Sequence, residues 1–596
     1  MTEILTKLDS AKQTGALSEA AVMNIRAWLM NDQLADFHQQ IVKLIDQSDW
    51  QTLSDDFYTQ LEFGTAGIRG RTGLGSARIN RWTVGTATQG LADYIQLAGN
   101  PTKGVVIGSD TRLTSPEFVE LVINILSSND IKVYRFKNPP QVGMFSFAVR
   151  HFKAQAGIYI SASHNPPTDN GLKIYWEDGA QLLPPHDKAL IEAVKKVAKF
   201  NQTTRQPDNQ TTIIGESFDE TYRHRVLQES VYDGRSAKIV YSPFHGTGIY
   251  GVLPIMREAG FEVITVDEQM TPDGNFPNIP GGIPNPQNRE SNTLTAQKVL
   301  ETGADVGIST DPDADRLALV VPKGDTTFIL DGNETATLLA YFICKQLKEG
   351  HKLPTNGFLV RTFVSTPMID AIADDFGLKY YSDLPVGFKF IGECIKQHED
   401  VGNELFIFAG EESFGCLKGS YARDKDASSA VLIAAEMISW LKDTGKTVWD
   451  LLDEVYNKYG YYLLDLVDIK IEGASGFDTM TKLMNGLRSA PPQTIGSWNV
   501  KRVIDRSCNE VKDNSSEVIE KLVGHTTNAI ILELSDDHNN WVVVRPSGTE
   551  PKVKLYTCVY QPVTGSKSIA SVRETALQTS QQLKTAITTL VERSTS

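Results

Sequence analysis

The 596-residue sequence has few cysteines and no long apolar run. Its five cysteines are odd in number and scattered, and no CxxC pair occurs, which indicates reduced thiols that are buried or idle. The first ten residues are polar and charged and lack the apolar segment of a signal peptide. No stretch approaches the roughly 18 apolar residues of a membrane span. We therefore expect a cytoplasmic protein with reduced thiols and no membrane contact.

Basic side chains are also in deficit. The chain has 58 Lys and Arg against 73 Asp and Glu, which gives a formal net charge of −15. An acidic surface repels nucleic acid, so we expect no nucleic-acid partner, and a small anion needs a locally basic site. Hydrophobic residues make up 41%, which is ordinary for a globular protein, and the length exceeds that of a single core. Several folded domains are expected.

One pattern recurs three times after a helical region at about residues 16–47. Each unit opens with an apolar, β-branched run, continues with helix-like segments, and has a second apolar run that ends in a polar loop. These second runs are Gly157–Ile160, Ala304–Ile308 and Leu405–Phe408. Alternating strands and helices indicate α/β units, in which functional loops lie at the carboxyl ends of strands. The C-terminal part differs: it predicts strands near residues 541–545 and 553–560, then a long helix from about Ser568.

We predict an α/β protein with three similar mixed α/β domains and a C-terminal α+β domain around a central cleft. The predicted domains are residues 1–225, 226–334, 335–460 and 461–596. Residues 201–215 are polar and are interpreted as a linker. Residues 272–286 contain too many prolines for regular structure and are interpreted as an ordered loop within the second domain.

Three aspartates, Asp311, Asp313 and Asp315, directly follow the apolar run of the second domain. Carboxylates this close repel one another unless a cation lies between them. An EF-hand is excluded, because its glycine and glutamate positions hold Arg316 and Pro322. A Mg²⁺ site with room for a phosphoryl oxygen fits best. A purely structural acidic turn is the alternative.

Three other polar loops offer complementary chemistry. The turn after Ile160 presents the Ser163 hydroxyl on a rigid edge. The segment Arg545–Thr549 combines a guanidinium, hydroxyls and a glycine, which suits a phosphate. The segment Gly410–Ser413 offers carboxylates and a hydroxyl that suit adjacent sugar hydroxyls. A nucleophile, a charge-neutralising site and a phosphate site are the parts that phosphoryl transfer needs.

These loops, in this order and over nearly the whole chain, resemble those of the α-D-phosphohexomutases, the phosphoglucomutase/phosphomannomutase superfamily. The resemblance implies that Ser163 carries a phosphoryl group and joins the three aspartates in binding one Mg²⁺. The residues with implied catalytic roles are Ser163, His164, Lys173, Lys389 and Arg69 of the motif Thr65–Arg69. The residues with implied substrate contacts are Glu411, Ser413, Gly387, Arg423, Lys425, Arg545, Ser547, Gly548 and Thr549.

The implied reaction interconverts hexose 1-phosphate and hexose 6-phosphate through phospho-Ser163 and a hexose 1,6-bisphosphate. Glucose is the favoured sugar, with glucose 1,6-bisphosphate as intermediate and activator, and mannose and pentose phosphates are alternatives. One departure concerns Gly415, which stands where some bacterial members carry a histidine. Lys389 is therefore the better candidate for proton transfer in the third domain, and His164 more plausibly orients the serine loop. A monomer and a homodimer are both compatible with the sequence.

Two other functions compete with this interpretation. Gly246–Gly251 is a literal GxGxxG that follows a strand and opens a helix, as in NAD-dependent dehydrogenases. However, Pro243–His245 separates the strand from the glycines, where a dinucleotide site needs a tight turn. A non-catalytic sugar-phosphate binder is the second alternative. The presence of Ser163 together with all three aspartates argues against it.

Overall fold

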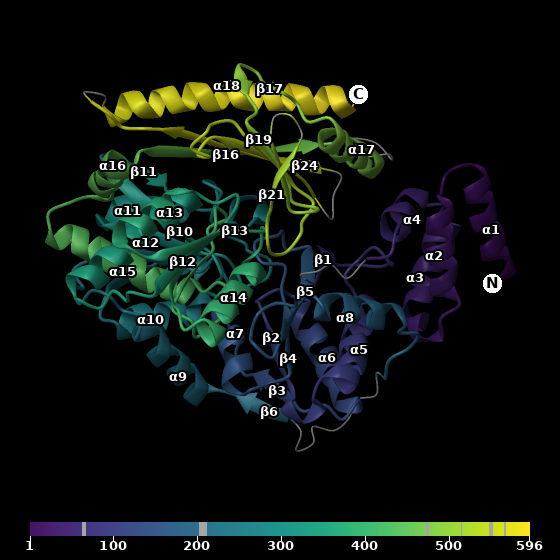
Figure 1. The fold of residues 1–596 in the computed structure, drawn as a ribbon. Coiled ribbons are helices and arrows are strands. Elements are labelled where there is room, and N and C mark those ends of the chain that lie inside the picture. The colour runs from purple at the N-terminus through teal and green to yellow at the C-terminus, as the bar shows by residue number, and fades with distance from the viewer. Residues whose placement is uncertain are drawn as a thin grey trace. The chain divides into compact units, whose positions relative to one another are not determined.

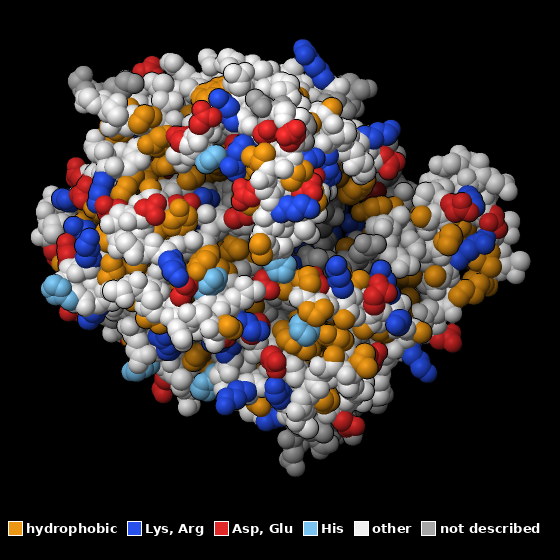
Figure 2. Space-filling model, viewed as in Figure 1, with side chains coloured by type: hydrophobic (Ala, Val, Ile, Leu, Met, Phe, Trp, Pro, Cys, Tyr) orange, Lys and Arg blue, Asp and Glu red, His pale blue; other side chains and the backbone are white. Residues whose placement is uncertain are grey.

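The computed structural model describes residues 1–61, 67–201, 211–471, 476–513, 515, 517–547, 552–565 and 568–595. The chain divides into two compact units (Figure 1). Unit 1 contains Met1–Ser230, Arg235–Ile329 and Gly419–Ala435, and unit 2 contains Val231–Gly234, Leu330–Lys418 and Glu436–Ser596. No helix among the described residues is long and apolar enough to cross a membrane. Acidic and basic side chains are interspersed on the face shown in Figure 2.

Unit 1 begins with four helices that share a hydrophobic core of their own. Leu8, Ile25, Ile41 and Phe57 are fully buried in it. The Ser18 hydroxyl accepts the Ala21 N–H and caps the second helix. The helical region is therefore longer than the predicted residues 16–47. The helices are α1 (Thr2–Gln13), α2 (Glu19–Leu29), α3 (Ala35–Asp46) and α4 (Trp50–Phe57).

The first sheet of unit 1 has six strands in the order β1-β5-β4-β2-β3-β6. Strands β2, β3, β4 and β6 are parallel, whereas β5 and β1 are antiparallel to their neighbours. The strands are β1 (Ile68–Arg71), β2 (Val105–Ser109), β3 (Val133–Phe136), β4 (Ala156–Ile160), β5 (Asp169–Trp176) and β6 (Thr211–Ile214). The linker prediction for residues 201–215 was wrong at its end, because the β-branched Thr211–Ile214 pairs with β3 as an edge strand.

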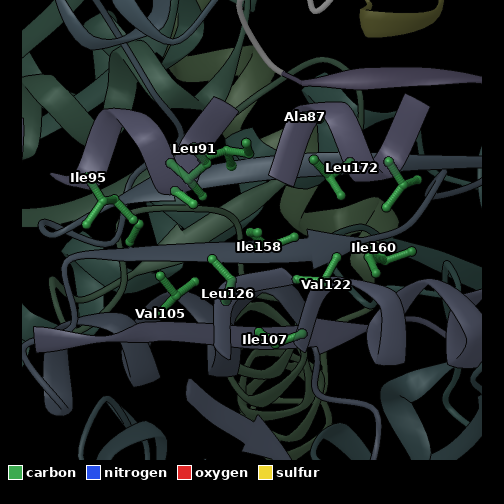
Figure 3. Close-up of a cluster of buried hydrophobic side chains, with 14 of the residues drawn as sticks. Ala87, Leu91, Ile95, Val105, Ile107, Val122, Leu126, Ile158, Ile160 and Leu172 are labelled. Carbon is green, nitrogen blue, oxygen red and sulfur yellow. The ribbon is translucent and has the colours of Figure 1, made fainter. Parts of the chain in front are cut away.

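Helices α5 (Arg81–Ala98) and α6 (Ser115–Ser128) pack on one face of this sheet (Figure 3). Ile158 and Ile160 of β4 point into the same cluster as Leu91 of α5 and Leu126 of α6. Because successive side chains of a strand alternate between faces, the residues between them point the other way. That second face carries Tyr159 of β4 and, from β5, Lys173 and Tyr175. The alternation of β5 thus separates its core residues from its polar ones.

The second sheet of unit 1 has the order β11-β10-β9-β7-β8. Strands β7, β8 and β9 are parallel, and β10 and β11 are antiparallel. The strands are β7 (Lys238–Ser242), β8 (Glu262–Thr265), β9 (Val306–Thr310), β10 (Leu317–Lys323) and β11 (Thr326–Ile329). Residues 272–286 are an irregular loop of this unit with one short 3₁₀ turn, Pro280–Gly282, as predicted.

The other helices that begin in unit 1 are α7 (Val142–His151), α8 (His186–Lys195), α9 (Glu216–Leu227), α10 (Val252–Glu258), α11 (Thr293–Thr302) and α15 (Ala427–Asp443). Helix α15 continues into unit 2.

Unit 2 contains a four-stranded sheet of the same kind, in the order β13-β12-β14-β15. Strands β12, β13 and β14 are parallel and β15 is antiparallel to β14. The strands are β12 (Gly357–Thr362), β13 (Lys379–Leu384), β14 (Leu405–Gly410) and β15 (Cys416–Lys418). Its helices are α12 (Gly332–Glu349), α13 (Met368–Phe376), α14 (Phe388–Lys396) and α16 (Val448–Tyr459).

The C-terminal part of unit 2 is an antiparallel sheet covered by helices, which confirms the predicted α+β architecture. Its strand order is β16-β24-β23-β22-β19-β20-β21, and α18 packs along β16 and β24 (Figure 1). The elements are β16 (Tyr461–Lys470), α17 (Gly476–Ser489), β17 (Thr494–Ile495), β18 (Trp498–Asn499), β19 (Arg502–Asp505), β20 (Glu510–Asp513), β21 (Val518–Lys521), β22 (Ile530–Glu533), β23 (Trp541–Pro546), β24 (Lys552–Gln561) and α18 (Ile569–Thr595).

The three α/β sheets present their polar loops at one shared topological position. Each loop joins a parallel strand to the antiparallel strand that follows it: β4 to β5, β9 to β10, and β14 to β15. Each loop also contains one non-glycine residue with a left-handed φ, which is 51° at Ser163, 48° at Ala314 and 71° at Phe414. The serine, aspartate and candidate sugar loops therefore share one type of turn at the same position in their sheets.

Candidate active site

Ser163 lies in the tight turn that joins β4 to β5 and is 1% exposed. Its backbone N–H donates to the Ser161 hydroxyl at 2.7 Å. Its own hydroxyl donates to a carboxylate oxygen of Asp311 at 2.7 Å. The turn therefore aims the serine oxygen at the aspartate loop of the neighbouring sheet, although the two residues are 148 positions apart in the chain.

Asp311, Asp313 and Asp315 form a compact, buried set of carboxylates. One oxygen from each lies within 4.8 Å of the others. Two oxygens, Oδ1 of Asp313 and Oδ1 of Asp315, are buried and accept no hydrogen bond from the described part of the chain. Oxygen ligands in this number and arrangement fit Mg²⁺, which takes few protein carboxylates and completes its shell with phosphate or water. The Asp313 carbonyl is held by the Val142 N–H at 3.0 Å, so the loop is also fixed from α7.

Two lysines balance part of this negative charge. The Lys173 ammonium donates to Asp313 at 2.8 Å and lies 3.5 Å from Asp315. The Lys425 ammonium lies 3.3 Å from the same oxygen of Asp315. Burial lowers the pKa of Lys173, but the carboxylates of Asp313 and Asp315 outweigh burial and leave the pKa above its ordinary value. Lys173 is therefore a fixed cation of the carboxylate cluster, and its catalytic role stays a prediction.

The pKa values of Asp311 and Asp313 shift in opposite directions. Burial and the charges of the other two aspartates raise the pKa of Asp311 well above its ordinary value. Burial acts on Asp313 in the same direction, but Lys173 and Arg69 outweigh it and hold the pKa of Asp313 below its usual range. Lys173 thus pairs with Asp313, whereas the Ser163 hydroxyl pairs with Asp311.

His164 and Arg69 flank the serine. The His164 Nδ1 lies 3.2 Å from the Ser163 hydroxyl oxygen. Burial, with Arg316 nearby, lowers the pKa of His164 well below its ordinary value, so the imidazole is neutral at pH 7. Arg69 is exposed on β1, and its guanidinium lies 3.5 Å from the Asn165 side-chain oxygen. Thr65 and Ala66 of its motif lie outside the described residues, whereas Gly67 and Ile68 are described.

The segment that carries Arg423 and Lys425 belongs to unit 1 by its contacts. Asp424 anchors it by accepting hydrogen bonds from the Tyr175 hydroxyl and the Gln181 amide, each at 2.7 Å. Asp424 also holds the Lys425 ammonium at 3.1 Å. Sequence reasoning missed Asp424, because only the alternation of β5 brings Tyr175 to the same face as Lys173.

Arg423 lies in the same segment and is buried. The residue is 1% exposed, its backbone N–H donates to the Ser146 hydroxyl, and its guanidinium donates to the Ser420 carbonyl. These contacts support the chain locally and leave almost none of the guanidinium accessible. The predicted substrate contact of Arg423 stays a prediction, whereas the Lys425 ammonium reaches the carboxylates of Asp315 and Asp424.

The candidate sugar loop in unit 2 is a tight hairpin. The Glu411 N–H donates to the Gly415 carbonyl at 2.9 Å, and Glu411 is buried while Ser413 is partly exposed. The neighbouring carboxylate, Glu412, accepts the Ser365 hydroxyl at 3.1 Å. Gly415 therefore closes the turn through its carbonyl.

Lys389 and Gly387 lie together at the start of α14. Gly387 precedes the helix with a φ of 126°, a conformation that L side chains rarely adopt. Lys389 is buried, and its ammonium lies 5.1 Å from the centre of the Phe390 ring. The predicted roles of both residues stay predictions.

The candidate phosphate loop follows β23. Arg545 pairs across the sheet with Lys554 of β24, and the Ser547 N–H donates to the Lys552 carbonyl at 2.8 Å. Gly548 and Thr549 lie outside the described residues. Burial lowers the pKa of Lys554, a cation that sequence reasoning missed. Lys554 lies beside Arg545 because of the register between β23 and β24, and this register cannot be derived from the sequence.

Other protein atoms occupy the space beside each glycine of the GxGxxG segment. A Cβ at Gly246 would lie 2.3 Å from the Pro312 Cα, and one at Gly248 would lie 2.0 Å from the Tyr241 hydroxyl. A Cβ at Gly251 would lie 1.4 Å from the Gln141 side-chain nitrogen. These glycines admit the aspartate loop and its neighbours, so a dinucleotide pyrophosphate has no access there. The structure gives no support to the dehydrogenase alternative.

Comparison with known families agrees with this arrangement. The chain matches the four phosphoglucomutase/phosphomannomutase family models: alpha/beta/alpha domain I at residues 60–201, domain II at 220–324, domain III at 331–459 and the C-terminal domain at 510–560. A phosphoglucomutase of Staphylococcus aureus (strain N315) is 33% identical over 558 residues, which cover 91% of this chain and 96% of that protein. A phosphoglucomutase of Staphylococcus haemolyticus is 34% identical over 526 residues, covering 84% and 90%.

Solved structures share the fold. A phosphoglucomutase/phosphomannomutase family protein from Burkholderia thailandensis has a TM-score of 0.61 at 17% identity and covers 89% of this chain and 98% of its own. The Paramecium phosphoprotein parafusin has a TM-score of 0.62 at 17% identity, covering 88% and 96%. This chain belongs to the phosphoglucomutase/phosphomannomutase family. It is thus an isomerase of the phosphoglucomutase family that acts on hexose phosphates, and the family is Mg²⁺-dependent.

Metal binding is expected to stabilise the folded protein. Mg²⁺ relieves the repulsion within the carboxylate cluster and binds only the folded arrangement, so a millimolar addition should raise Tm and EDTA should reverse the rise. Asp311→Asn should abolish the Mg²⁺-dependent rise. Asp325→Asn, in the exposed turn after β10, serves as the control and should keep it. An unchanged Mg²⁺ response in Asp311→Asn would contradict the assignment.

Lys425 is expected to compete with the metal for Asp315. Removal of this positive charge by Lys425→Met should tighten Mg²⁺ binding by about threefold to tenfold, measured by calorimetry, because a cation 3.3 Å from the carboxylate is lost. Lys195→Met, on the exposed face of α8, should leave Mg²⁺ affinity unchanged. If Lys425→Met alters only the KM for sugar phosphate, then Lys425 acts on substrate alone.

Proposed function

We propose that this protein interconverts the 1-phosphate and 6-phosphate of glucose, with Ser163 as the phosphoryl carrier. The observation that carries the proposal is the 2.7 Å hydrogen bond from the Ser163 hydroxyl to Asp311 inside the cluster of three carboxylates. A hydroxyl held against a magnesium-type site is placed for phosphoryl transfer. A purely structural acidic turn would not need two buried carboxylate oxygens without hydrogen-bond donors among the described residues.

The reaction has two half-reactions. In the first, the P–O bond to Ser163 breaks, a substrate hydroxyl forms the new P–O bond and loses its proton, and Ser163 regains a proton. In the second, the other phosphate of the bisphosphate is transferred to Ser163, and the freed sugar oxygen is protonated. One Mg²⁺ held by Ser163 and the three aspartates would supply charge stabilisation. Lys173 is a fixed cation of the carboxylate cluster that the serine hydroxyl faces, and His164 orients the serine side chain.

The choice of glucose rests on the relatives and on the sugar loop. The matched Staphylococcus proteins are named phosphoglucomutase, at 32–34% identity. The hairpin Gly410–Gly415 carries a buried carboxylate, Glu411, and a partly exposed hydroxyl, Ser413, a combination that suits recognition of two adjacent sugar hydroxyls. Mannose and pentose phosphates are the competing substrates. Glu411, Ser413, Gly387, Lys389, Arg545 and the neighbouring loop residues are proposed as substrate ligands of unit 2.

Further features of the proposal follow from the same family resemblance. Glucose 1,6-bisphosphate is proposed as intermediate and activator, which primes Ser163 with its phosphoryl group. The domain boundaries at residues 225, 334 and 460 are proposed for a cytoplasmic enzyme that is a monomer or a homodimer. Nucleic acid and membrane are not proposed as partners.

Substrate preference is tested by comparing kcat/KM for the 1-phosphates of glucose, mannose and ribose at fixed Mg²⁺. We expect glucose 1-phosphate to exceed the other two by at least about tenfold, which corresponds to about 1.4 kcal/mol of differential transition-state stabilisation. Equal or higher kcat/KM for mannose or ribose 1-phosphate would reassign the substrate while leaving the mutase chemistry in place.

Dependence on the carrier is tested with Ser163→Ala. Removal of the hydroxyl eliminates the acceptor of the second half-reaction, so kcat should fall by more than about 10⁴-fold while the protein remains folded. Thr102→Ala, in an exposed turn, is the control and should have wild-type activity. Full mutase activity in Ser163→Ala would refute the mechanism, and binding of sugar phosphate without turnover by the wild type would favour the non-catalytic alternative.

A further inference from the structure

A buried arginine lies directly beneath the serine loop. Arg112 is in the segment between β2 and α6 and is 1% exposed. It is separated from Ser163 by 51 positions in the chain. The parallel pairing of β2 with β4 brings the ends of these two strands together, and Arg112 with them. Arg112 is not among the residues implied by the family resemblance, and it is not part of the candidate metal site.

All five N–H donors of the Arg112 guanidinium are satisfied, four of them by backbone carbonyls of the serine loop. An arginine has five donors in a fixed planar fork and no acceptor, so this is its full capacity. The four loop acceptors are the carbonyls of Ser163 at 2.7 Å, Asn165 at 2.6 Å, Pro166 at 2.6 Å and Asp169 at 2.8 Å. The fifth donor, Nε–H, reaches the Asp110 carboxylate at 3.1 Å. The guanidinium therefore connects the start, middle and end of the turn.

Arg112 itself is held from two sides. Asp110 accepts both the Nε–H and the backbone N–H of Arg112, so the carboxylate fixes the side chain and the backbone together. On the other side, the Phe276 ring lies under the guanidinium, with 5.3 Å between the central carbon and the ring centre. A Cβ at Gly274 would lie 2.7 Å from the Arg112 Cα, so the chain passes this residue closely.

This packing gives the proline-rich loop a position in the site. The loop of residues 272–286 supplies Phe276 and Gly274 against Arg112, and Gly282 lies against the Pro167 side chain of the serine loop. A Cβ at Gly282 would be 3.3 Å from Pro167. The loop thus covers Arg112 and excludes water from its hydrogen bonds, which strengthens them.

Ser163 is the residue that most needs this support. Its φ of 51° is a left-handed conformation that a non-glycine residue adopts only when its surroundings enforce it. Arg112 binds the Ser163 carbonyl, which is part of the backbone, and leaves the hydroxyl free to face Asp311. A contact to the backbone persists whether the side chain is a hydroxyl or a phosphate ester.

We propose that Arg112 is the positioning residue that keeps the serine oxygen in one place through both half-reactions. This inference rests on the proposed function, because a carrier that alternately donates and accepts a phosphoryl group needs the same oxygen position in both states. Arg112 touches neither substrate nor the reacting atoms. Its effect is exerted through the geometry of the turn, where a misplacement of about 1 Å costs on the order of 100-fold in rate.

Lysine is the informative replacement. An ammonium keeps the charge and much of the buried stem, but it has three donors on a single nitrogen and cannot span four carbonyls. Arg112→Lys should therefore lower kcat by about 10- to 100-fold, while the KM for glucose 1-phosphate stays within about twofold. Hydrogen exchange of the backbone amides of residues 161–169 should accelerate in this variant, in both the phosphorylated and the unphosphorylated enzyme.

Arg235→Lys is the matched control. Arg235 also lies over an aromatic ring, Phe261, at 4.9 Å and donates to a backbone carbonyl, that of Ala259, at 2.9 Å. It lies outside the serine loop, so Arg235→Lys should keep wild-type kcat and wild-type exchange of residues 161–169. In Arg112→Ala, millimolar guanidinium should restore part of the lost kcat, whereas the same addition should not raise the rate of Arg235→Lys.

The outcomes separate this inference from the proposed function. Wild-type kcat and unchanged amide exchange in Arg112→Lys would overturn the positioning role, even if Tm fell. A kcat loss equal to that of Arg235→Lys at a matched fall in Tm would overturn it as well, because the effect would then be general destabilisation. If the wild-type enzyme shows no mutase activity, the proposed function fails, and the exchange comparison still decides whether Arg112 holds the loop.

Discussion

The concentration of negative charge around the Ser163 hydroxyl is the constraint on which the site depends. Three carboxylates with oxygens within 4.8 Å of one another are buried beside it, an arrangement that is unfavourable without cations. Lys173 and Lys425 balance part of the charge from two different segments. Two carboxylate oxygens accept no hydrogen bond from the described residues, which leaves them available to a metal ion. The local fold of unit 1 can be understood as the means of holding this charge in place.

The scaffold achieves this by repeating one hairpin. A parallel strand ends, a tight turn with one left-handed residue follows, and an antiparallel strand returns, at Ser163, Ala314 and Phe414. Each turn is supported from outside its own hairpin. The serine turn is held by Arg112, and the aspartate loop is held at its Asp313 carbonyl by α7. The repeated hairpin therefore sets where each loop lies at the edge of its sheet. Contacts that are not repeated, such as those of Arg112, fix the conformation of each individual loop.

Features that are contiguous in the chain could be predicted from the sequence, and features that depend on distant pairing could not. The Asp311–Asp315 triad and Ser163 stand out because each follows an apolar strand directly. The Arg112 contacts and the approach of Lys425 to Asp315 depend on strand order and on burial between segments far apart in sequence. The edge strand β6 is hard to distinguish from a polar linker in the sequence, because it consists of only four β-branched residues, Thr211–Ile214.

The most direct measurement is the phosphorylation state of Ser163 during turnover. Enzyme treated with glucose 1,6-bisphosphate and freed of excess would be analysed by peptide mass spectrometry before and after a stoichiometric chase with glucose 1-phosphate. We expect one phosphoryl group on Ser163 that disappears in the chase as glucose bisphosphate forms. A phosphoryl group on another residue, or one on Ser163 that substrate cannot remove while the enzyme turns over, would contradict it.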